Sequence, residues 1–418
     1  MKQRKIIDRR DFLTGGLAGF SLAATTPHFL GLTSNVFAAD GSGSDRILVV
    51  LQLSGGNDGL STVVPYGNDA YYRVRRGTAI REQDVLEIEQ GTGLHPALKG
   101  LQALYGDGRM AIVQGCSYPN PNRSHFQSMD IWHTGDERGR GLRTGWLGRA
   151  IDACCPDQQD PELVVNVGSA LPYALEADVH KPISFEQPNA YRWAGNPRDA
   201  KEFEQINEAT DTENDTVDWL HRVAVDARTS SRKVREATRN YKPKADYGAG
   251  RGGGGRRGGR LANDLRSVAA LIAAGFKTRI YYVSFGGFDT HNNQRNRHDQ
   301  LMAQLDVALS AFMADLKAQG LSERVLVLSF SEFGRRVAEN GSQGTDHGVA
   351  GPMFLFGDGV KAGLHGKHPS LTDLDKGDLK MTTDFRSVYA SVLDDWVGVA
   401  PEKVLGRRYA KLPVIGRA

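Results

Sequence analysis

Short apolar runs alternate with segments of helical spacing along most of this chain, and this alternation limits the possible folds more than any other feature. Arg46 to Leu53 is apolar after its first residue except for Gln52, and Arg279 to Phe285 is rich in β-branched and aromatic residues. Runs of this kind are typical of strands buried on both faces. Leu261 to Phe276 and His298 to Gln319 show helical spacing. The pattern predicts a three-layer α/β/α sandwich around a mostly parallel sheet.

The remaining elements of this pattern are shorter. We expect strands at 110–114, 163–167, 325–330 and 352–356, and helices at 95–105, 124–132, 146–153 and 384–396. The region from 203 to 260 interrupts the alternation. Its first part, Phe203 to Asn240, is polar and predicts two helices, and Tyr247 to Arg260 is rich in glycine and arginine. We expect this region to be an insertion that carries a surface loop.

The first 38 residues have the features of an export signal. Arg9-Arg10-Asp11-Phe12-Leu13 matches the twin-arginine pattern, and a mild apolar stretch from Leu17 to Leu32 follows. Small residues before Ala39 favour cleavage after Ala38, which leaves a mature domain at 39–418. The apolar stretch is short and interrupted by Pro27, so a cleaved signal is favoured over a membrane anchor. We therefore expect recognition by the twin-arginine export machinery and a periplasmic or secreted location.

Composition limits the partners of this chain. A formal net charge of +3 over 418 residues is too small to indicate a nucleic-acid or membrane-surface partner. Arg-Gly tracts can bind nucleic acid, so an RNA-binding protein is one alternative, but a surface loop is the better interpretation in an exported protein. Cys116, Cys154 and Cys155 do not have the spacing of a disulfide framework, and we expect ordinary packing residues with an odd thiol, although an exported location would permit one bridge.

Acidic residues and histidines follow the predicted strands at the points where these strands end. Asn57-Asp58 follows the first strand, Asp289-Thr290-His291 follows strand 279–285, and Glu332 follows strand 325–330. Because the ligand crevice of an open α/β sheet lies at the carboxyl ends of its strands, we expect these side chains to lie close together. Carboxylate oxygens and imidazole nitrogens suit zinc, manganese or iron.

Two more motifs extend this candidate metal site. Gly344-Thr345-Asp346-His347-Gly348 presents an acid and an imidazole from one glycine-flanked turn. His365 is a candidate for completing the metal shell, with His368 as the competing choice. Glu332 is interpreted as a ligand, as an acid that holds a ligand histidine, or as half of an ion pair with Arg335 or Arg336. The predicted metal ligands are Asp58, Asp289, His291, Glu332, Asp346, His347 and His365.

Ser124 is the candidate nucleophile, because it follows a Pro/Asn-rich loop and precedes a predicted helix. A serine at that position is most simply an N-cap. A helix N-terminus also attracts anions, and a metal beside it would lower the pKa of the hydroxyl. His125 is a candidate ligand or acid–base group, and Arg123 a candidate clamp for an anionic ester.

Together these motifs resemble the alkaline phosphatase–sulfatase superfamily. The residues that carry the resemblance are Leu53–Gly59, Arg123–Phe126, Gly287–His291, Ser331–Arg335 and Thr345–Gly348. More narrowly, the chain resembles a family of bacterial proteins with twin-arginine signals that is catalogued as a domain of unknown function in that superfamily. The resemblance covers nearly the whole mature chain. It implies an alkaline phosphatase-like fold, two divalent metal ions (zinc, manganese, iron or calcium), Ser124 as nucleophile, Asp58 as the first-strand acid, Asp289, His291, Asp346 and His347 as ligands, and His365 as the late histidine.

The function expected from these residues is metal-dependent hydrolysis of a small phosphate or sulfate ester outside the cytoplasm. Fold alone does not establish function, so a non-catalytic exported protein that keeps this fold for binding or assembly is the main alternative. A metal-storage or delivery protein is a further one. We expect no nucleic-acid partner and no stable membrane anchor after processing.

Overall fold

A nine-stranded sheet lies at the centre of this computed structural model, which describes residues 45–156, 160–192, 202–203, 215–248 and 259–416. The strands are β1 (Ile47–Ser54), β5 (Met110–Ser117), β6 (Val164–Val167), β7 (Ile183–Phe185), β8 (Ile280–Gly286), β9 (Val325–Phe330), β10 (Gly351–Phe356), β11 (Gly363–His365) and β14 (Thr383–Asp384). Their order is β11-β5-β10-β9-β1-β8-β6-β7, with β14 beside β5. Among these strands only β10 is reversed, since it pairs antiparallel with both β5 and β9. The predicted mostly parallel sheet is confirmed.

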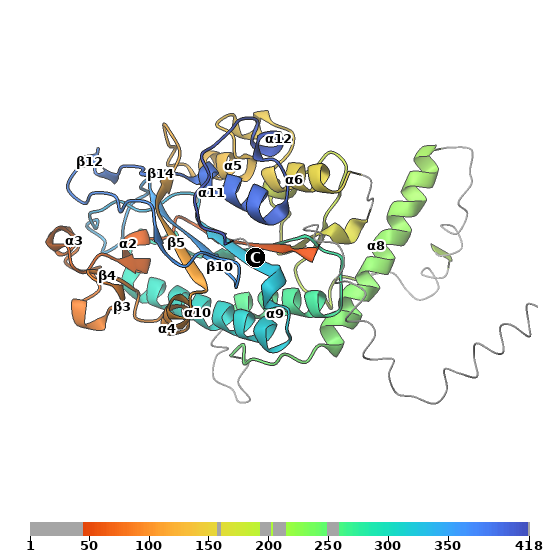
Figure 1. Ribbon diagram of the computed structural model, residues 1–418, viewed down its shortest axis with the longest axis horizontal. Helices are drawn as coiled ribbons and strands as arrows, with labels where there is room; N and C mark the ends of the chain where they lie inside the picture. The colour runs from red at the N-terminus through yellow and green to blue at the C-terminus, as the bar shows by residue number, and fades with distance from the viewer. Residues whose placement is uncertain (1–44, 157–159, 193–201, 204–214, 249–258, 417–418) are drawn as a thin grey trace, which may run out of the picture. The chain divides into compact units, whose positions relative to one another are not determined.

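Helices cover both faces of the sheet (Figure 1). One face packs against α4 (Lys99–Gly106), α9 (Gly259–Ala273) and α10 (Gln294–Ala318), and the other against α5 (His125–Thr134), α6 (Trp146–Cys154), α11 (Phe385–Val392) and α12 (Pro401–Leu405). Side chains of β1 alternate between the two cores: Val49 and Leu51 belong to the first, Leu48 and Val50 to the second. This is the period of two that a strand imposes. The three-layer prediction is therefore confirmed.

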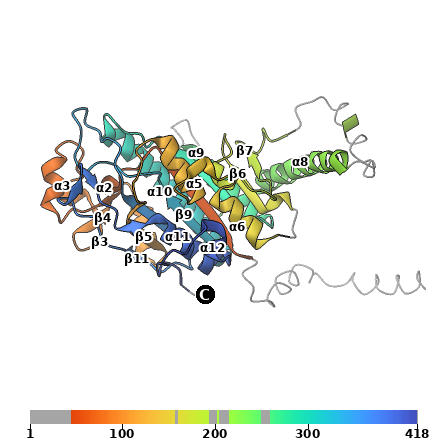
Figure 2. The same ribbon diagram turned by 90° about the horizontal axis from the view of Figure 1, so that it is seen from above.

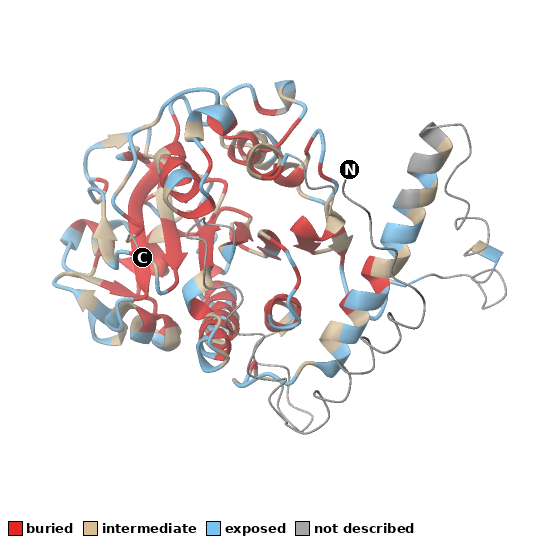
Figure 3. Cartoon of the chain, turned by 45° about the vertical axis from the view of Figure 1, so that its right-hand side comes forward, coloured by how far each residue is buried: buried red, intermediate tan, exposed pale blue. Residues whose placement is uncertain are grey.

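The layers are also distinct in the other two views. Seen from above, α5, α6, α11 and α12 lie in front of the sheet (Figure 2). Buried residues fill the strands and the faces of the helices turned toward them (Figure 3). No helix within the described ranges combines the length and apolarity that a membrane span requires.

Smaller elements surround the sheet. They are α2 (Gly59–Thr62), α3 (Asp69–Val74), a three-stranded sheet of β2 (Val63–Val64), β4 (Thr92–Leu94) and β3 (Leu86–Glu89), and a pair formed by β12 (Leu374–Asp375) and β13 (Asp378–Leu379). Single 3-10 turns lie at Glu82–Asp84, Gly139–Gly141, Pro161–Leu163, Tyr173–Leu175 and Ser322–Arg324. The closing helix predicted at 384–396 is α11 followed by a π-helical turn at Leu393–Val397.

The region expected as an insertion contains one long helix within the described residues, α8 (Asp215–Asn240). Its C-terminal part packs on α9, and Val234 is fully buried there. Residues 204–214, in which part of the two predicted helices falls, and 249–258 of the glycine-rich tract lie outside the described residues, as does the expected export signal.

One expectation about the cysteines is wrong. Cys154 and Cys155 form a disulfide at the end of α6, whereas we expected both to be ordinary packing residues. Cys116 is a free, buried thiol. Burial raises the pKa of that thiol, so it stays protonated and behaves as a small apolar residue.

Candidate metal centre

Three neighbouring strands bring the candidate residues to one edge of the sheet. β8 and β9 flank β1 on either side, all three run parallel, and Gly55, Gly287 and Ser331 follow them directly. Gly55 has a φ of +118°, and a Cβ at that position would lie 2.5 Å from the backbone nitrogen of Asp289. Only glycine permits this approach, so the loops after β1 and β8 pack tightly against each other.

Four side chains form a compact group, here named the His/Asp cluster: His125, Asp289, His291 and His347. Oδ1 of Asp289 lies 3.0 Å from Nε2 of His291 and 3.2 Å from Nε2 of His347. Oδ2 of Asp289 lies 3.7 Å from Nε2 of His125. The Nε2 atoms of His291 and His347 are 2.9 Å apart. The Asp289 side chain is 47% exposed, so the cluster is open to solvent on one side.

Each imidazole of the cluster is oriented by an oxygen atom at its other ring nitrogen. The acceptors for Nδ1 are Glu332 Oε1 for His125 (2.8 Å), the Arg123 carbonyl oxygen for His347 (2.9 Å) and Asp346 Oδ1 for His291 (3.2 Å). An oxygen at Nδ1 favours the tautomer with the proton on Nδ1, which leaves the lone pair on Nε2. The oxygen atom behind each ring corresponds to the outer partner in the carboxylate–histidine–metal arrangement, and the three Nε2 lone pairs face the side of Asp289.

The charge states suit the same arrangement. Burial lowers the pKa of His347, which favours its neutral form at pH 7. Burial alone would raise the pKa of Asp289, but the hydrogen bond and positive charge of Arg335 outweigh it and lower that pKa to about 2. The hydrogen bond to Glu332 raises the pKa of His125 despite partial burial. Asp289 is therefore a carboxylate at neutral pH, which is the form that binds a cation.

The spacing of these atoms suits a shared cation. With metal–ligand distances of about 2.0–2.2 Å, ligand atoms around tetrahedral zinc lie about 3.3–3.6 Å apart. Four of the separations in the cluster run from 2.9 to 3.7 Å, and the ligand atoms of His125, Asp289 and His347 all lie within 4.8 Å of one another. Nε2 of His125 is buried and has no hydrogen-bond partner among the described residues. Two imidazole lone pairs 2.9 Å apart repel each other unless a proton or a cation lies between them. The residues present therefore fit a bound metal ion.

Arg335 holds Asp289 in place, and the sequence did not indicate this role. Its fully buried guanidinium donates to Oδ1 of Asp289 at 2.8 Å and to the carbonyl oxygens of Gly55, Gly56, Phe288 and Thr345. These bonds tie together the loops after β1 and β8 and the turn before His347. The one available signal was an arginine three residues after Glu332, close to a strand end, and Asp289 was not identifiable as its partner.

The structure brings some of the predicted metal ligands together and places others elsewhere. Asp289 and His347 lie together with His125, which was predicted as a ligand or an acid–base group, and His291 contacts both Asp289 and His347. Glu332 and Asp346 lie behind His125 and His291 as acceptors for their Nδ1 atoms. Of the alternatives for Glu332, the structure matches the acid that holds a histidine.

Asp58 and His365 are not part of the cluster. Asp58 is fully buried, caps α2 through Leu60 N and pairs both carboxylate oxygens with Arg75. Because Asp58 follows Gly55, Gly56 and Asn57, it lies beyond the end of β1, where it pairs with Arg75. His365 lies on the edge strand β11, and its Nε2 bonds the carbonyl oxygen of Lys361. Within the described residues, one cluster of His, Cys, Asp or Glu groups is close enough to share an ion, although the resemblance implied two metals.

The predicted catalytic residues lie at the start of α5. Ser124 is the N-cap residue, but its side chain makes no capping hydrogen bond, which leaves the hydroxyl available. The side chain of Arg123, expected to clamp an ester, forms an ion pair with buried Asp378 of β13. Its carbonyl oxygen instead contributes to the site, as the acceptor for His347.

We expect Glu332→Gln to weaken metal binding by about tenfold or more, because a neutral amide orients and polarises the His125 imidazole less strongly than a carboxylate. The variant should also lower the pKa of His125 toward its ordinary value, since the Glu332 hydrogen bond is the main cause of the rise. Competition with a chromophoric chelator measures the affinity, and NMR titration of the metal-free protein measures the pKa. Exposed Glu402→Gln is the matched control; unchanged affinity in Glu332→Gln contradicts this role.

Solved structures resemble this chain at low sequence identity. A protein of the alkaline phosphatase superfamily from Vibrio parahaemolyticus is 11% identical, with a TM-score of 0.40 over 87% of this chain and 69% of that one. A lipoteichoic acid synthase from Listeria monocytogenes is 10% identical, with a TM-score of 0.35 over 82% and 76%. A sulfatase from Pseudoalteromonas sp. is 12% identical, with a TM-score of 0.34 over 78% and 66%. At these values no activity is transferred from those proteins to this chain.

Comparison at the level of sequence is more direct. No curated protein matches the chain. One family model, described as "Protein of unknown function (DUF1501)", matches residues 100–406, which is more than half of the 418 residues. The matched range contains all four residues of the His/Asp cluster. This chain therefore belongs to the DUF1501 family of proteins of unknown function.

Proposed function

We propose that this protein hydrolyses phosphate or sulfate esters with the help of a bound divalent metal, that Ser124 is the nucleophile, and that it works outside the cytoplasm. The observation that carries the proposal is the His/Asp cluster, in which three imidazole nitrogens and one carboxylate converge while each imidazole is fixed from behind. Such an arrangement has no evident structural role at a solvent-exposed edge of the sheet.

His125, Asp289, His291 and His347 would hold the metal. A set dominated by imidazole suits zinc, iron or another transition metal better than calcium, which prefers oxygen ligands. When bound, the metal would supply Lewis-acid stabilisation of the negative charge on the ester oxygens. The open side of the cluster would leave room for a small anionic ester.

Two features support Ser124 as the nucleophile. It directly precedes His125 of the cluster, and consecutive Cα atoms are about 3.8 Å apart. It also lies at the N-terminus of α5, where free backbone N–H groups and the helix dipole favour an anion. Both features support a role for this serine in binding and attacking an anionic ester.

The proposed reaction has two balanced steps. In the first, the Ser124 oxygen forms a bond to phosphorus or sulfur while the bond to the ester oxygen breaks. The serine proton passes to solvent, and the leaving alkoxide takes up one proton. In the second, a water molecule attacks the same atom, and the bond to the Ser124 oxygen breaks. The serine regains its proton, and phosphate or sulfate is released.

We expect Ser124→Ala to lower turnover of 4-nitrophenyl phosphate or 4-nitrophenyl sulfate by about 1,000-fold or more, because the attacking oxygen is lost. Metal content should not change, since Ser124 is outside the His/Asp cluster. Release of 4-nitrophenolate and elemental analysis measure the two quantities, and Ser169→Ala is an exposed serine control. Turnover that survives in Ser124→Ala excludes this nucleophile. A metal-loaded wild type without activity on any ester favours the non-catalytic binding role.

A further inference from the structure

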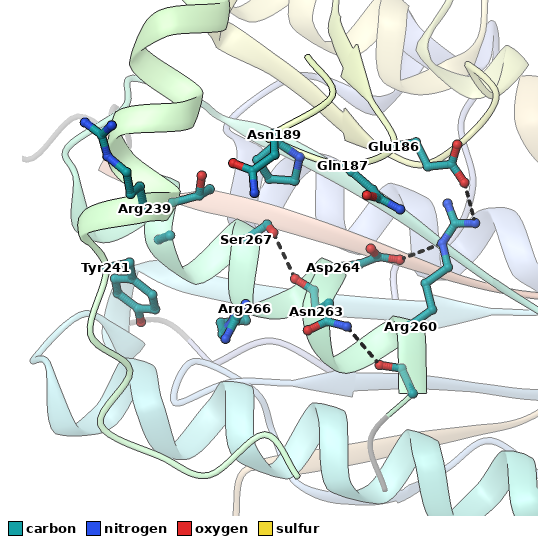
Figure 4. A pocket seen from close by; sticks show the side chains of 14 residues that line it. Glu186, Gln187, Asn189, Arg239, Tyr241, Arg260, Asn263, Asp264, Arg266 and Ser267 are labelled. Atoms are coloured by element: carbon teal, nitrogen blue, oxygen red, sulfur yellow. Dashed lines mark hydrogen bonds and ion pairs between the residues drawn. The ribbon is translucent and has the colours of Figure 1, made fainter. Parts of the chain in front are cut away.

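A pocket of about 650 Å³ lies between the C-terminal end of α8, α9 and the segment after β7. Figure 4 shows its lining side chains. Arg260, Asp264 and Arg266 extend from α9, Arg239 from α8, and Asn189 from the segment after β7. Its volume lies in the range of about 300–1,000 Å³ that is usual for ligand pockets. None of its residues belongs to the His/Asp cluster, so this pocket is separate from the proposed hydrolytic site.

The pocket is rich in unpaired arginines. A second pocket of about 280 Å³ shares Asn189 and Arg239 with the first, so the two form one continuous surface. The arginines that line them are Arg192, Arg232, Arg235, Arg239, Arg260 and Arg266. Within the described part of the chain, only Arg260 among them has a carboxylate at ion-pair distance, from Glu186 at 2.8 Å and Asp264 at 3.5 Å. Six arginines against three acidic residues, Glu186, Glu236 and Asp264, give these pockets a net positive charge.

Three acidic residues also line the two pockets: Glu186 pairs with Arg260, Glu236 lies in the second pocket, and Asp264 is buried. Asp264 is 5% exposed, and its burial raises its pKa to about 7, although Arg260 acts in the opposite direction. At neutral pH the carboxyl group therefore carries a proton for a large part of the time. A protonated carboxyl donates a hydrogen bond to an anion instead of repelling it.

The neutral polar side chains indicate a ligand that carries hydroxyl groups. Gln187, Asn189 and Asn263 line the pocket, and each amide both donates and accepts hydrogen bonds, as hydroxyl groups do. Tyr241 is the one aromatic residue on the pocket wall, and its hydroxyl is bound to Asp315. Single-stranded nucleic acids usually bind on several stacking aromatic side chains, so this surface suits them less well.

We propose that these two adjoining pockets bind an acidic oligosaccharide, a sugar chain with sulfate, phosphate or carboxylate groups. The arginines pair with its charged groups, with the strength and geometry typical of guanidinium–anion contacts. The amides and Ser267 bond its hydroxyl groups. This binding site is independent of ester hydrolysis at the His/Asp cluster and does not require it.

Isothermal titration calorimetry with a heparin-derived hexasaccharide tests the proposal on the full-length protein. We expect Arg239→Gln/Arg266→Gln to weaken binding by about 30-fold, because each lost charge-assisted contact costs several-fold in affinity. Both side chains are exposed, and a melting curve confirms that the variant folds. Arg73→Gln/Arg76→Gln removes the same charge from exposed arginines of α3 and the turn after it, and should stay within about twofold of wild type.

Several outcomes overturn the proposal. Equal weakening in both double variants shows non-specific attraction to basic residues. Binding of neutral maltohexaose as tight as that of the sulfated hexasaccharide shows that the arginines are not involved. Tighter binding of a ten-residue oligothymidylate than of the hexasaccharide identifies a nucleic-acid surface instead. The proposal is supported by selective loss in Arg239→Gln/Arg266→Gln, with the preference for the sulfated sugar intact.

Discussion

Replacement of His347 by alanine is expected to leave the purified protein without stoichiometric metal and to weaken its metal affinity by more than about 100-fold. Removal of a group that hydrogen-bonds a metal ligand already weakens metal affinity about 10- to 100-fold, and removal of the ligand itself weakens it further. His347 is central because its Nε2 lies 3.2 Å from Asp289 and 2.9 Å from His291. Elemental analysis of protein purified without chelator gives the stoichiometry, and chelator competition gives the affinity.

The sequence itself offers the matched control for this experiment. His365→Ala removes another histidine that was predicted as a ligand, but its Nε2 bonds the Lys361 carbonyl oxygen away from the cluster. That variant should keep its metal at the wild-type level. Metal retained in His347→Ala contradicts the His/Asp cluster as the binding site. Metal lost in both variants indicates a second site that depends on His365, as the family resemblance implied.

Arg75→Met is expected to lower the free energy of unfolding by about 3–5 kcal/mol, because it leaves the buried Asp58 carboxylate without its charge partner. Both side chains of this pair are fully buried. Arg75 also donates to the carbonyl oxygens of Val337 and Arg336, which lose their donor in the variant. Urea unfolding at pH 7 measures the effect. Arg81→Met breaks an exposed pair with Asp84 and should cost less than about 1 kcal/mol.

The stability difference between Arg75→Met and wild type should also depend on pH. Burial alone would raise the pKa of Asp58, but Arg75 outweighs it and holds that pKa well below its ordinary value. The wild-type pair therefore contributes stability above pH of about 4, and loses it only as pH falls toward the lowered value. Without Arg75, burial raises the pKa of Asp58, so the penalty fades as the solution is acidified. The difference in free energy of unfolding between wild type and Arg75→Met should therefore decrease from pH 7 to pH 4. A difference that increases over this range contradicts the explanation.

The layers and the strand ends were predictable because they depend on local patterns. Leu48 and Val50 face one core, and Val49 and Leu51 the other, so β1 had to be a strand buried on both faces. The same reasoning located Asp289 and His291 directly after β8. The disulfide between Cys154 and Cys155 was missed because neighbouring cysteines carry no spacing signal.

The division of roles among the acids and histidines depended on contacts between distant residues. Hydrophobic periodicity and strand direction are local properties, so they predicted the three-layer fold and a position at one edge of the sheet for Asp289, His291 and His347. The three-dimensional contacts were needed to distinguish the candidate metal ligands from the residues that orient them. Arg335, which orients Asp289, donates a hydrogen bond to the carbonyl oxygen of Gly55, 280 residues away in the sequence. Glu332 accepts a hydrogen bond from His125, 207 residues away, and Arg75 forms an ion pair with Asp58. Such partners are selected by three-dimensional proximity and burial, which no local pattern in the sequence records.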